Sequence, residues 1–212
     1  MAVLAFSVLL AASPAYADMQ DDVDQAATII ERFQAVPEKA IPQAVLKDAR
    51  GLAIMTVIKA GFGISGRGGS GVVAARIKNG WSGPSAIGAG GAGFGFQIGA
   101  EVMEFVMVLN TDAAVKAFSQ DANVTLGGGM SVAAGPVGRH VEAAITPVAA
   151  VYTYSLSQGL FAGISLEGTV IGTRNDVNAA YYGRPVTAGE ILSGKVAPPP
   201  GAKRLLQVLA RH

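Results

Sequence analysis

The stretches GFGISGRGGSG (residues 61–71) and GAGGAGFGFQIG (residues 88–99) decide the fold that this sequence predicts. In the second stretch, Phe94, Phe96 and Ile98 alternate with glycine or glutamine, which is the two-residue period of a β-strand. Glycine inside a strand is typical of a bulge, a sharp bend or a close approach of another backbone. The glycine-rich pieces therefore predict a tightly curved sheet.

Helical patterns flank this region. Residues 18–35 place apolar side chains every three or four positions, which predicts an amphipathic helix with Val23, Ala26, Ala27, Ile30 and Phe33 on one face. Shorter helices are expected at residues 42–50, 112–118 and 175–182. The apolar run LAIMTVI (residues 52–58) predicts a buried strand.

These elements predict one α+β domain. It consists of a glycine-rich, strongly curved antiparallel sheet, either barrel-like or a sandwich, with an N-terminal amphipathic helix and short flanking helices. The domain is expected to span residues 18–195. A proline-rich linker and a short C-terminal helix follow at residues 196–212.

Residues 1–17 have the pattern of a signal peptide. Ala2 to Ala12 is apolar, and Ala15-Tyr16-Ala17 fits a small-x-small cleavage site, with Asp18 as the new N-terminus. The apolar run is too short to span a bilayer. The alternative is an ordinary buried helix. We expect an exported, periplasmic protein that is peripheral to the membrane.

Composition excludes several classes of function. The net charge of +1 shows no basic excess for nucleic-acid binding, and the absence of cysteine excludes disulfides and thiolate metal sites. The histidines are His140 and His212, too few for an imidazole metal cluster. The string Gly61-x-Gly63-x-x-Gly66 matches a dinucleotide fingerprint, but the glycines after Arg67 cannot begin a helix. We expect no cofactor and no enzymatic activity, because no acid, base and nucleophile converge.

Several short motifs occur in an order that resembles the SYLF domain, over about residues 20–195. They are Ile41-Pro42, Ala49-Arg50-Gly51-Leu52-Ala53-Ile54, Lys59-Ala60-Gly61-Phe62-Gly63, Gly69-x-Gly71-Val72-Val73, Trp81-Ser82-Gly83-Pro84-Ser85, Gly93-x-Gly95-x-Gln97-x-Gly99, Gly135-Pro136-x-Gly138-Arg139, Tyr154-Ser155-x-Ser157-x-Gly159-Leu160-Phe161-x-Gly163, Leu166-Glu167-Gly168 and Asn178 with Tyr181-Tyr182-Gly183.

The resemblance implies a non-enzymatic lipid-binding domain. Eukaryotic SYLF domains bind phosphoinositides, some bind actin, and their membrane contact is attributed to an N-terminal amphipathic helix with nearby basic residues. Carried over here, the lipid-binding residues would be Val23, Ile30, Phe33, Arg32, Lys39, Lys47 and Arg50. We expect binding to the anionic phospholipid of a membrane surface. We do not expect actin as a partner, because an exported protein would not meet it.

The acidic residues of the helix support a different role for it. Asp21, Asp22, Asp24 and Glu31 would be repelled by an anionic bilayer, which favours a helix docked on the sheet. Two alternative functions therefore stay open. One is a structural or partner-binding periplasmic protein, and the other is a carrier of a small apolar ligand inside the sheet.

Overall fold

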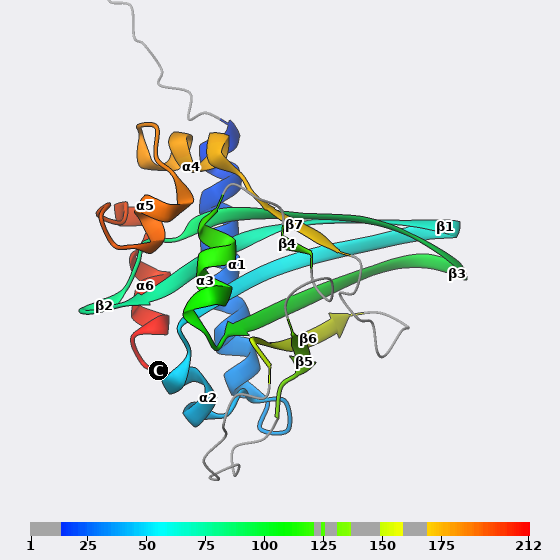
Figure 1. The fold of residues 1–212 in the computed structure, drawn as a ribbon. Coiled ribbons are helices and arrows are strands. Elements are labelled where there is room, and N and C mark those ends of the chain that lie inside the picture. The colour runs from blue at the N-terminus through cyan, green and yellow to red at the C-terminus, as the bar shows by residue number, and fades with distance from the viewer. Residues whose placement is uncertain (1–13, 121–123, 126–130, 137–148, 159–168) are drawn as a thin grey trace, which may run out of the picture.

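Helices lie against both faces of one curled sheet (Figure 1). The computed structural model describes residues 14–120, 124–125, 131–136, 149–158 and 169–212. Helix α1 (Pro14–Ala35) crosses one face, and α3 (Asp112–Ser119) crosses the other. This arrangement confirms the predicted α+β class with a strongly curved sheet.

Two long strands form most of the sheet. β1 (Gly51–Ile77) and β3 (Ser85–Leu109) pair antiparallel, from Gly51 opposite Leu109 to Val73 opposite Ser85. Both strands turn back at the end of a projecting arm, near a register shift between Phe62 and Ile64 (Figure 1). The two halves of β1 therefore lie side by side, and the Arg76 N–H donates to the Arg50 carbonyl at 2.8 Å.

Glycine permits the two halves of β1 to approach each other. A Cβ atom on Gly71 would lie 2.1 Å from the carbonyl oxygen of Ile54, and one on Gly69 would lie 2.3 Å from that of Thr56. Real Cβ atoms do not occupy such positions, so any side chain here would push the two halves apart. The predicted bend and close backbone approach thus both occur.

Short strands extend the sheet from β3. β6 (Val151–Gln158) and β7 (Val170–Thr173) pair antiparallel with opposite halves of β3. The remaining short strands are β2 (Gly80–Trp81) on β1, β4 (Val124–Thr125) on β7, and β5 (Val132–Ala134) on β6. The β5–β6 pair is parallel, so the sheet is mixed and the expectation of a purely antiparallel sheet was wrong there.

Alternate residues of β1 enter two separate apolar layers. Leu52 and Ile54 pack in the layer that contains α1, whereas Ala53, Met55 and Val57 pack in the layer that contains α3. Burial on both faces explains why the sequence here is a continuous apolar run rather than an alternating one. The predicted buried strand is confirmed.

The shorter helices close the fold. They are α2 (Gln43–Asp48), α4 (Asn175–Tyr182), α5 (Ala188–Leu192), the 3-10 turn η1 (Pro200–Ala202) and α6 (Lys203–Leu209). Leu205 and Leu209 of α6 are buried in the same layer as α1. Helix α1 begins at Pro14 and so continues through the predicted cleavage point before Asp18. Of the motifs quoted for the SYLF resemblance, the pieces at residues 138–139, 159–163 and 166–168 lie outside the described residues.

Replacement of Gly71 by alanine is expected to destabilise the protein by about 2 kcal/mol or more, because the new methyl group would overlap the Ile54 backbone. Gly68→Ala is the matched control, since nothing lies within 4 Å of its Cβ position. The control should change the free energy of unfolding by no more than about 0.5 kcal/mol. Urea unfolding of both variants measures the difference, and equal effects would contradict a close packing of the two halves of β1.

Candidate functional site

The apolar face of α1 lies in the core. Val23, Ile30 and Phe33 are each at most 1% exposed and pack in one layer with strand residues such as Leu52 and Ile54. In this conformation the three side chains cover the sheet, as expected of a docked amphipathic helix. A direct contact between them and lipid stays a prediction, and it would require α1 to leave the sheet.

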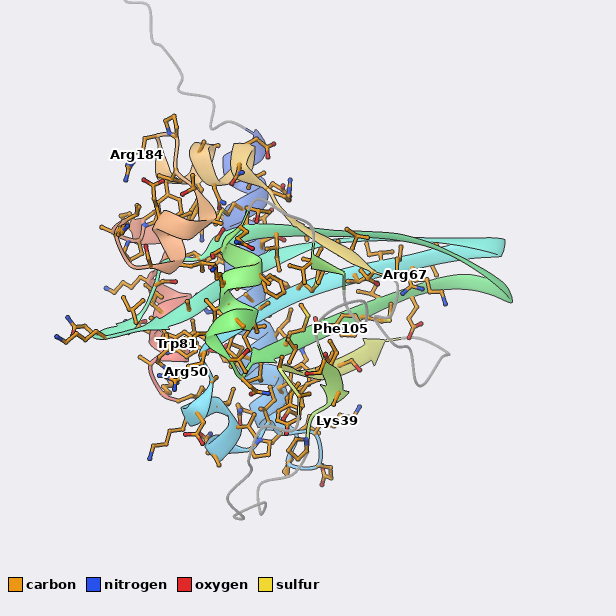
Figure 2. The ribbon with its side chains drawn as sticks, in the orientation of Figure 1. Lys39, Arg50, Arg67, Trp81, Phe105 and Arg184 are labelled. Atoms are coloured by element: carbon orange, nitrogen blue, oxygen red, sulfur yellow. The ribbon has the colours of Figure 1, made fainter. Side chains whose placement is uncertain are left out.

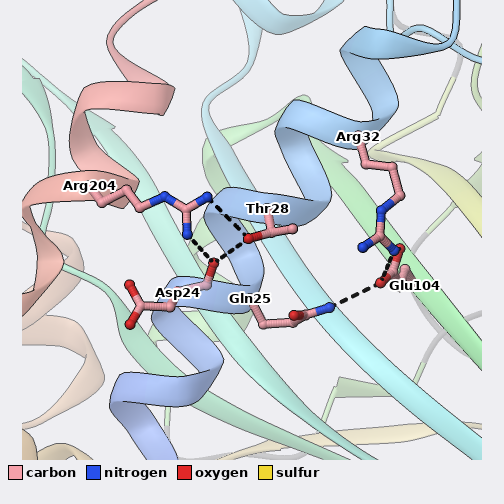
Figure 3. Close-up of polar contacts among 6 residues, drawn as sticks. All are labelled: Asp24, Gln25, Thr28, Arg32, Glu104 and Arg204. Atoms are coloured by element: carbon pink, nitrogen blue, oxygen red, sulfur yellow. Dashed lines mark hydrogen bonds and ion pairs between the residues drawn. The ribbon is translucent and has the colours of Figure 1, made fainter.

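An ion pair joins α1 to β3. Nη1 of Arg32 lies 2.5 Å from both carboxylate oxygens of Glu104, and Nε2 of Gln25 donates to the same carboxylate at 3.0 Å (Figure 3). Glu104 is only 4% exposed. A buried carboxylate requires such partners, and removal of one partner is strongly destabilising. Arg32 is therefore engaged within the protein.

A second polar contact lies nearer the start of α1. Oγ of Ser70 donates to Oδ1 of Asp22 at 2.7 Å, and Nη1 of Arg174 lies 3.8 Å from the other carboxylate oxygen. Arg174 also pairs with Asp18. Burial raises the pKa of Asp22 to about 6, and the negative charge of Asp18 acts in the same direction.

Helix α6 holds the outer side of α1. Arg204 pairs with Glu31 at 2.9 Å. It also donates to the Asp24 carbonyl and to Thr28 (Figure 3). Part of the acidic surface of α1 is thus directed to basic residues of this protein. Asp22 and Glu31, two of the acidic residues that argued against a membrane-lying helix, thus help to dock it.

The other predicted basic residues lie at one end of the molecule. Lys39, Lys47 and Arg50 are exposed in and around α2, as Figure 2 shows for Lys39 and Arg50. Nε of Arg50 is 3.8 Å from Oδ1 of exposed Asp112, a separation that contributes little in water. We call Lys39, Lys47 and Arg50 the basic end. Three of the four predicted cations are therefore exposed at this end of the molecule, whereas Arg32 lies on α1 and is paired with Glu104.

Arg76 and Trp81 connect this end to the C-terminus. Nη2 of Arg76 donates to the Leu46 carbonyl at 2.9 Å, and its guanidinium carbon lies 4.2 Å from the Trp81 ring centre. Trp81 Nε1 donates to the Leu209 carbonyl at 3.1 Å. The sequence interpretation did not assign Arg76 a role, because its partners are far away in the sequence.

Burial, followed by the charges of Arg211 and Arg76, lowers the pKa of His212.

The described residues contain no group of three or more His, Cys, Asp or Glu side chains that would hold a metal ion. Within the same part of the chain, no helix combines the length and apolar character needed to cross a bilayer.

A hollow between α1 and β1, lined by Asp22, Ala26, Thr56 and Gly71 among others, leaves no space for a bound molecule. It does not provide the interior site that the carrier alternative needs.

Asp22 makes stability depend on pH. Its folded pKa of about 6 exceeds the ordinary value of 3.8, so between these values the folded protein holds a proton that the unfolded chain has released. The free energy of unfolding should therefore fall as pH rises from about 4 to about 6. Asp22→Asn should remove this slope and raise the melting temperature at pH 7, since an amide oxygen still accepts from Ser70.

The control for this prediction is Asp21→Asn, which alters an exposed carboxylate of the same helix turn. It should keep most of the wild-type pH dependence, because the charge of Asp21 is the smallest of the effects that raise the pKa of Asp22. Thermal unfolding at several pH values measures both variants, and an identical slope in the two would show that Asp22 is not the responsible group.

Comparison with known proteins places the chain in a family. The family described as "Ysc84: Las17-binding protein actin regulator" matches residues 90–212. LAS seventeen-binding protein 3 of Saccharomyces cerevisiae is 53% identical over 177 residues, which are 81% of this chain and 39% of that protein. SH3 domain-containing YSC84-like protein 1 is 47% identical in Xenopus laevis, over 93% of this chain and 62% of that protein. The human protein of that name is 45% identical, over 93% and 60%.

These relatives correct the prediction about partners. We expected a membrane surface as the partner and did not expect actin. The family is described as an actin regulator, and its yeast member LAS seventeen-binding protein 3 is named for binding Las17. The exclusion was wrong because it came from the predicted export of the chain and not from its binding residues. The chain spans less than two thirds of the length of these relatives. It belongs to the Ysc84 family, which is the SYLF-domain family that its sequence resembles.

Proposed function

We propose that this chain is a non-enzymatic binding domain that associates peripherally with anionic phospholipid through its basic end. The observation that carries the proposal is the exposure of Lys39, Lys47 and Arg50 together around α2. Lysine and arginine near a membrane surface each contribute about 1 kcal/mol of attraction to anionic lipid. Three such residues at one end suffice for weak, salt-sensitive association.

Neighbouring residues add to the positive potential of this end. Arg211 is exposed, and its charge, with that of Arg76, acts on His212 in the same direction as burial. Nδ1 of His212 lies 3.0 Å from Oε1 of Gln43 in α2, which ties the C-terminus to the basic end. Glu38 and Asp48 oppose this potential in part. The balance favours general anionic-lipid attraction over a pocket for one phosphoinositide head group.

In this proposal α1 has a structural role, and the first lipid contact does not involve it. Contact by Val23, Ile30 and Phe33 would expose apolar surface of the sheet and break the Arg32–Glu104 pair. Both losses oppose release of the helix in solution. We further propose a location in the cell envelope, on the basis of the signal-like residues 1–17 alone.

The family description favours a second candidate function, which is binding to a protein of the actin-regulatory machinery. It is a candidate rather than the main proposal because the named relatives contain long segments that this chain does not match. Co-sedimentation of the purified chain with actin filaments, and capture on immobilised Las17, would test it. Binding to either one supports this candidate, and binding to neither would remove it.

Replacement of Lys39, Lys47 and Arg50 by alanine should weaken sedimentation with anionic vesicles at least tenfold at low salt, because it removes about 3 kcal/mol of attraction. The matched control replaces Lys78, Arg184 and Lys195, which are exposed elsewhere and remove the same charge. Figure 2 shows Arg184 far from Arg50 and Lys39. The control should bind more tightly than the basic-end variant. Equal weakening by both would mean that net charge, and not the basic end, drives association.

A further inference from the structure

One face of the sheet is covered by α1 only over its inner part. Even-numbered strand residues near the body, such as Ile54, Ser70 and Glu104, contact or pack beneath α1. Farther along, and among the residues whose burial the structure describes, a set of even-numbered strand positions is exposed. We call these exposed residues the bare face, and they are Ile58, Ala60, Gly66, Gly68, Gly90, Ala100, Val102 and Val170.

The bare face consists only of glycine and aliphatic residues. Ile58 is 54% exposed and lies opposite Val102, which is 40% exposed, and Gly90 lies opposite Val170 at 38%. Beyond the Ile58–Val102 pair the register sets Ala60 opposite Ala100. Contiguous exposed apolar surface on a soluble protein marks an interaction site.

The charges of the arm lie on odd-numbered positions. Lys59, Arg67 and Glu101 alternate with the residues of the bare face and therefore belong to the opposite face of the strands. Lys59 lies opposite Glu101 in the β1–β3 register, and Nη1 of Arg67 donates to Oγ1 of Thr169 at 3.2 Å. Figure 2 shows Arg67 on the arm, away from the helices. The residues of the bare face therefore carry no charged side chain themselves, as expected of a surface that enters the apolar part of a bilayer.

We propose that the bare face of the β1–β3 arm inserts into the interfacial layer of an anionic bilayer. The proposal rests on the proposed lipid-binding function and adds a second, apolar contact to the basic end. The observed chemistry favours lipid over a protein partner. Protein interfaces form about one hydrogen bond per 100–200 Å², and the side chains of the bare face offer no donor or acceptor. The arm also projects beyond the helices, which leaves it free to reach a surface (Figure 1).

The test uses the full chain with vesicles of phosphatidylcholine alone and of an equimolar mixture with phosphatidylserine. Ile58→Ser combined with Val102→Ser should weaken binding to the mixed vesicles about tenfold, because two aliphatic side chains no longer enter the apolar layer. The difference should persist in salt that screens the basic end. The control is Ala113→Ser combined with Ala210→Ser, at exposed apolar positions in α3 and directly after α6. Circular dichroism verifies that both variants fold.

A fluorescent reporter gives a second measurement. Trp81 is buried, so tryptophan placed by Ala60→Trp on the bare face dominates any change in emission. Its emission should shift to shorter wavelength with mixed vesicles and be quenched by brominated lipid chains. Reduced binding of the serine variant together with quenching of the reporter supports insertion.

Three outcomes would overturn the proposal. Equal vesicle binding by the serine variant and wild type, without quenching, would leave the basic end as the lipid contact and remove the arm from it. A wild-type chain that binds no vesicles would remove both the arm proposal and the proposed function. A lipid-free dimer in analytical ultracentrifugation that the serine variant dissociates would show that a second copy of the chain covers the bare face.

Discussion

The rest of this structure depends on the contact between Gly69 and Gly71 and the backbone of Ile54 and Thr56. Because no side chain separates them, β1 can turn at the end of the arm and return beside itself. β3 follows β1 residue by residue, so one bent ribbon supplies both halves of the sheet. The short strands β6 and β7 then pair with different halves of β3 although they are close in sequence. The glycine-rich composition is thus the condition for the sheet topology.

The bent ribbon also determines what α1 does. The helix crosses both halves of β1 and reaches β3, with Asp22 on Ser70 at one point and Arg32 on Glu104 at another. Its apolar side chains fill the layer that the strands and α6 share. A helix bound in this way covers one side of the hydrophobic core. The proposed lipid contacts are therefore the basic end and the part of the arm that α1 does not cover. Both proposed contacts lie outside the surface that α1 covers, and neither uses the apolar face of this helix.

Much of the fold was predictable because its signals are local. The two-residue period around Phe94, the three-to-four-residue period of α1 and the apolar run at residues 52–58 each indicate the correct element. The apolar pattern of α1 does not show whether this helix packs on the sheet or lies on a membrane, since both kinds of helix have the same periodicity. The ion pair between Arg32 and Glu104 ties the helix to the sheet, and these two residues are 72 positions apart. Large sequence separation also hid the contact of Arg76 with Leu46 of α2 and that of Trp81 with Leu209. The parallel pairing of β5 with β6 was not signalled by the sequence either. Among the predicted lipid-binding residues, the sequence identified the cations but not which one was already paired.

Hydrogen–deuterium exchange of the full chain, with and without anionic vesicles, tests the central claim most directly. If α1 stays packed on the sheet, the amides of residues 19–33 will be equally protected in both samples. Protection should increase on vesicle addition at residues 39–50 and in the arm, which are the surfaces assigned to lipid. The contrary result is a loss of protection in α1 when vesicles are added. That loss would show that the helix leaves the sheet to bind the membrane, and that Val23, Ile30 and Phe33 are the lipid contact.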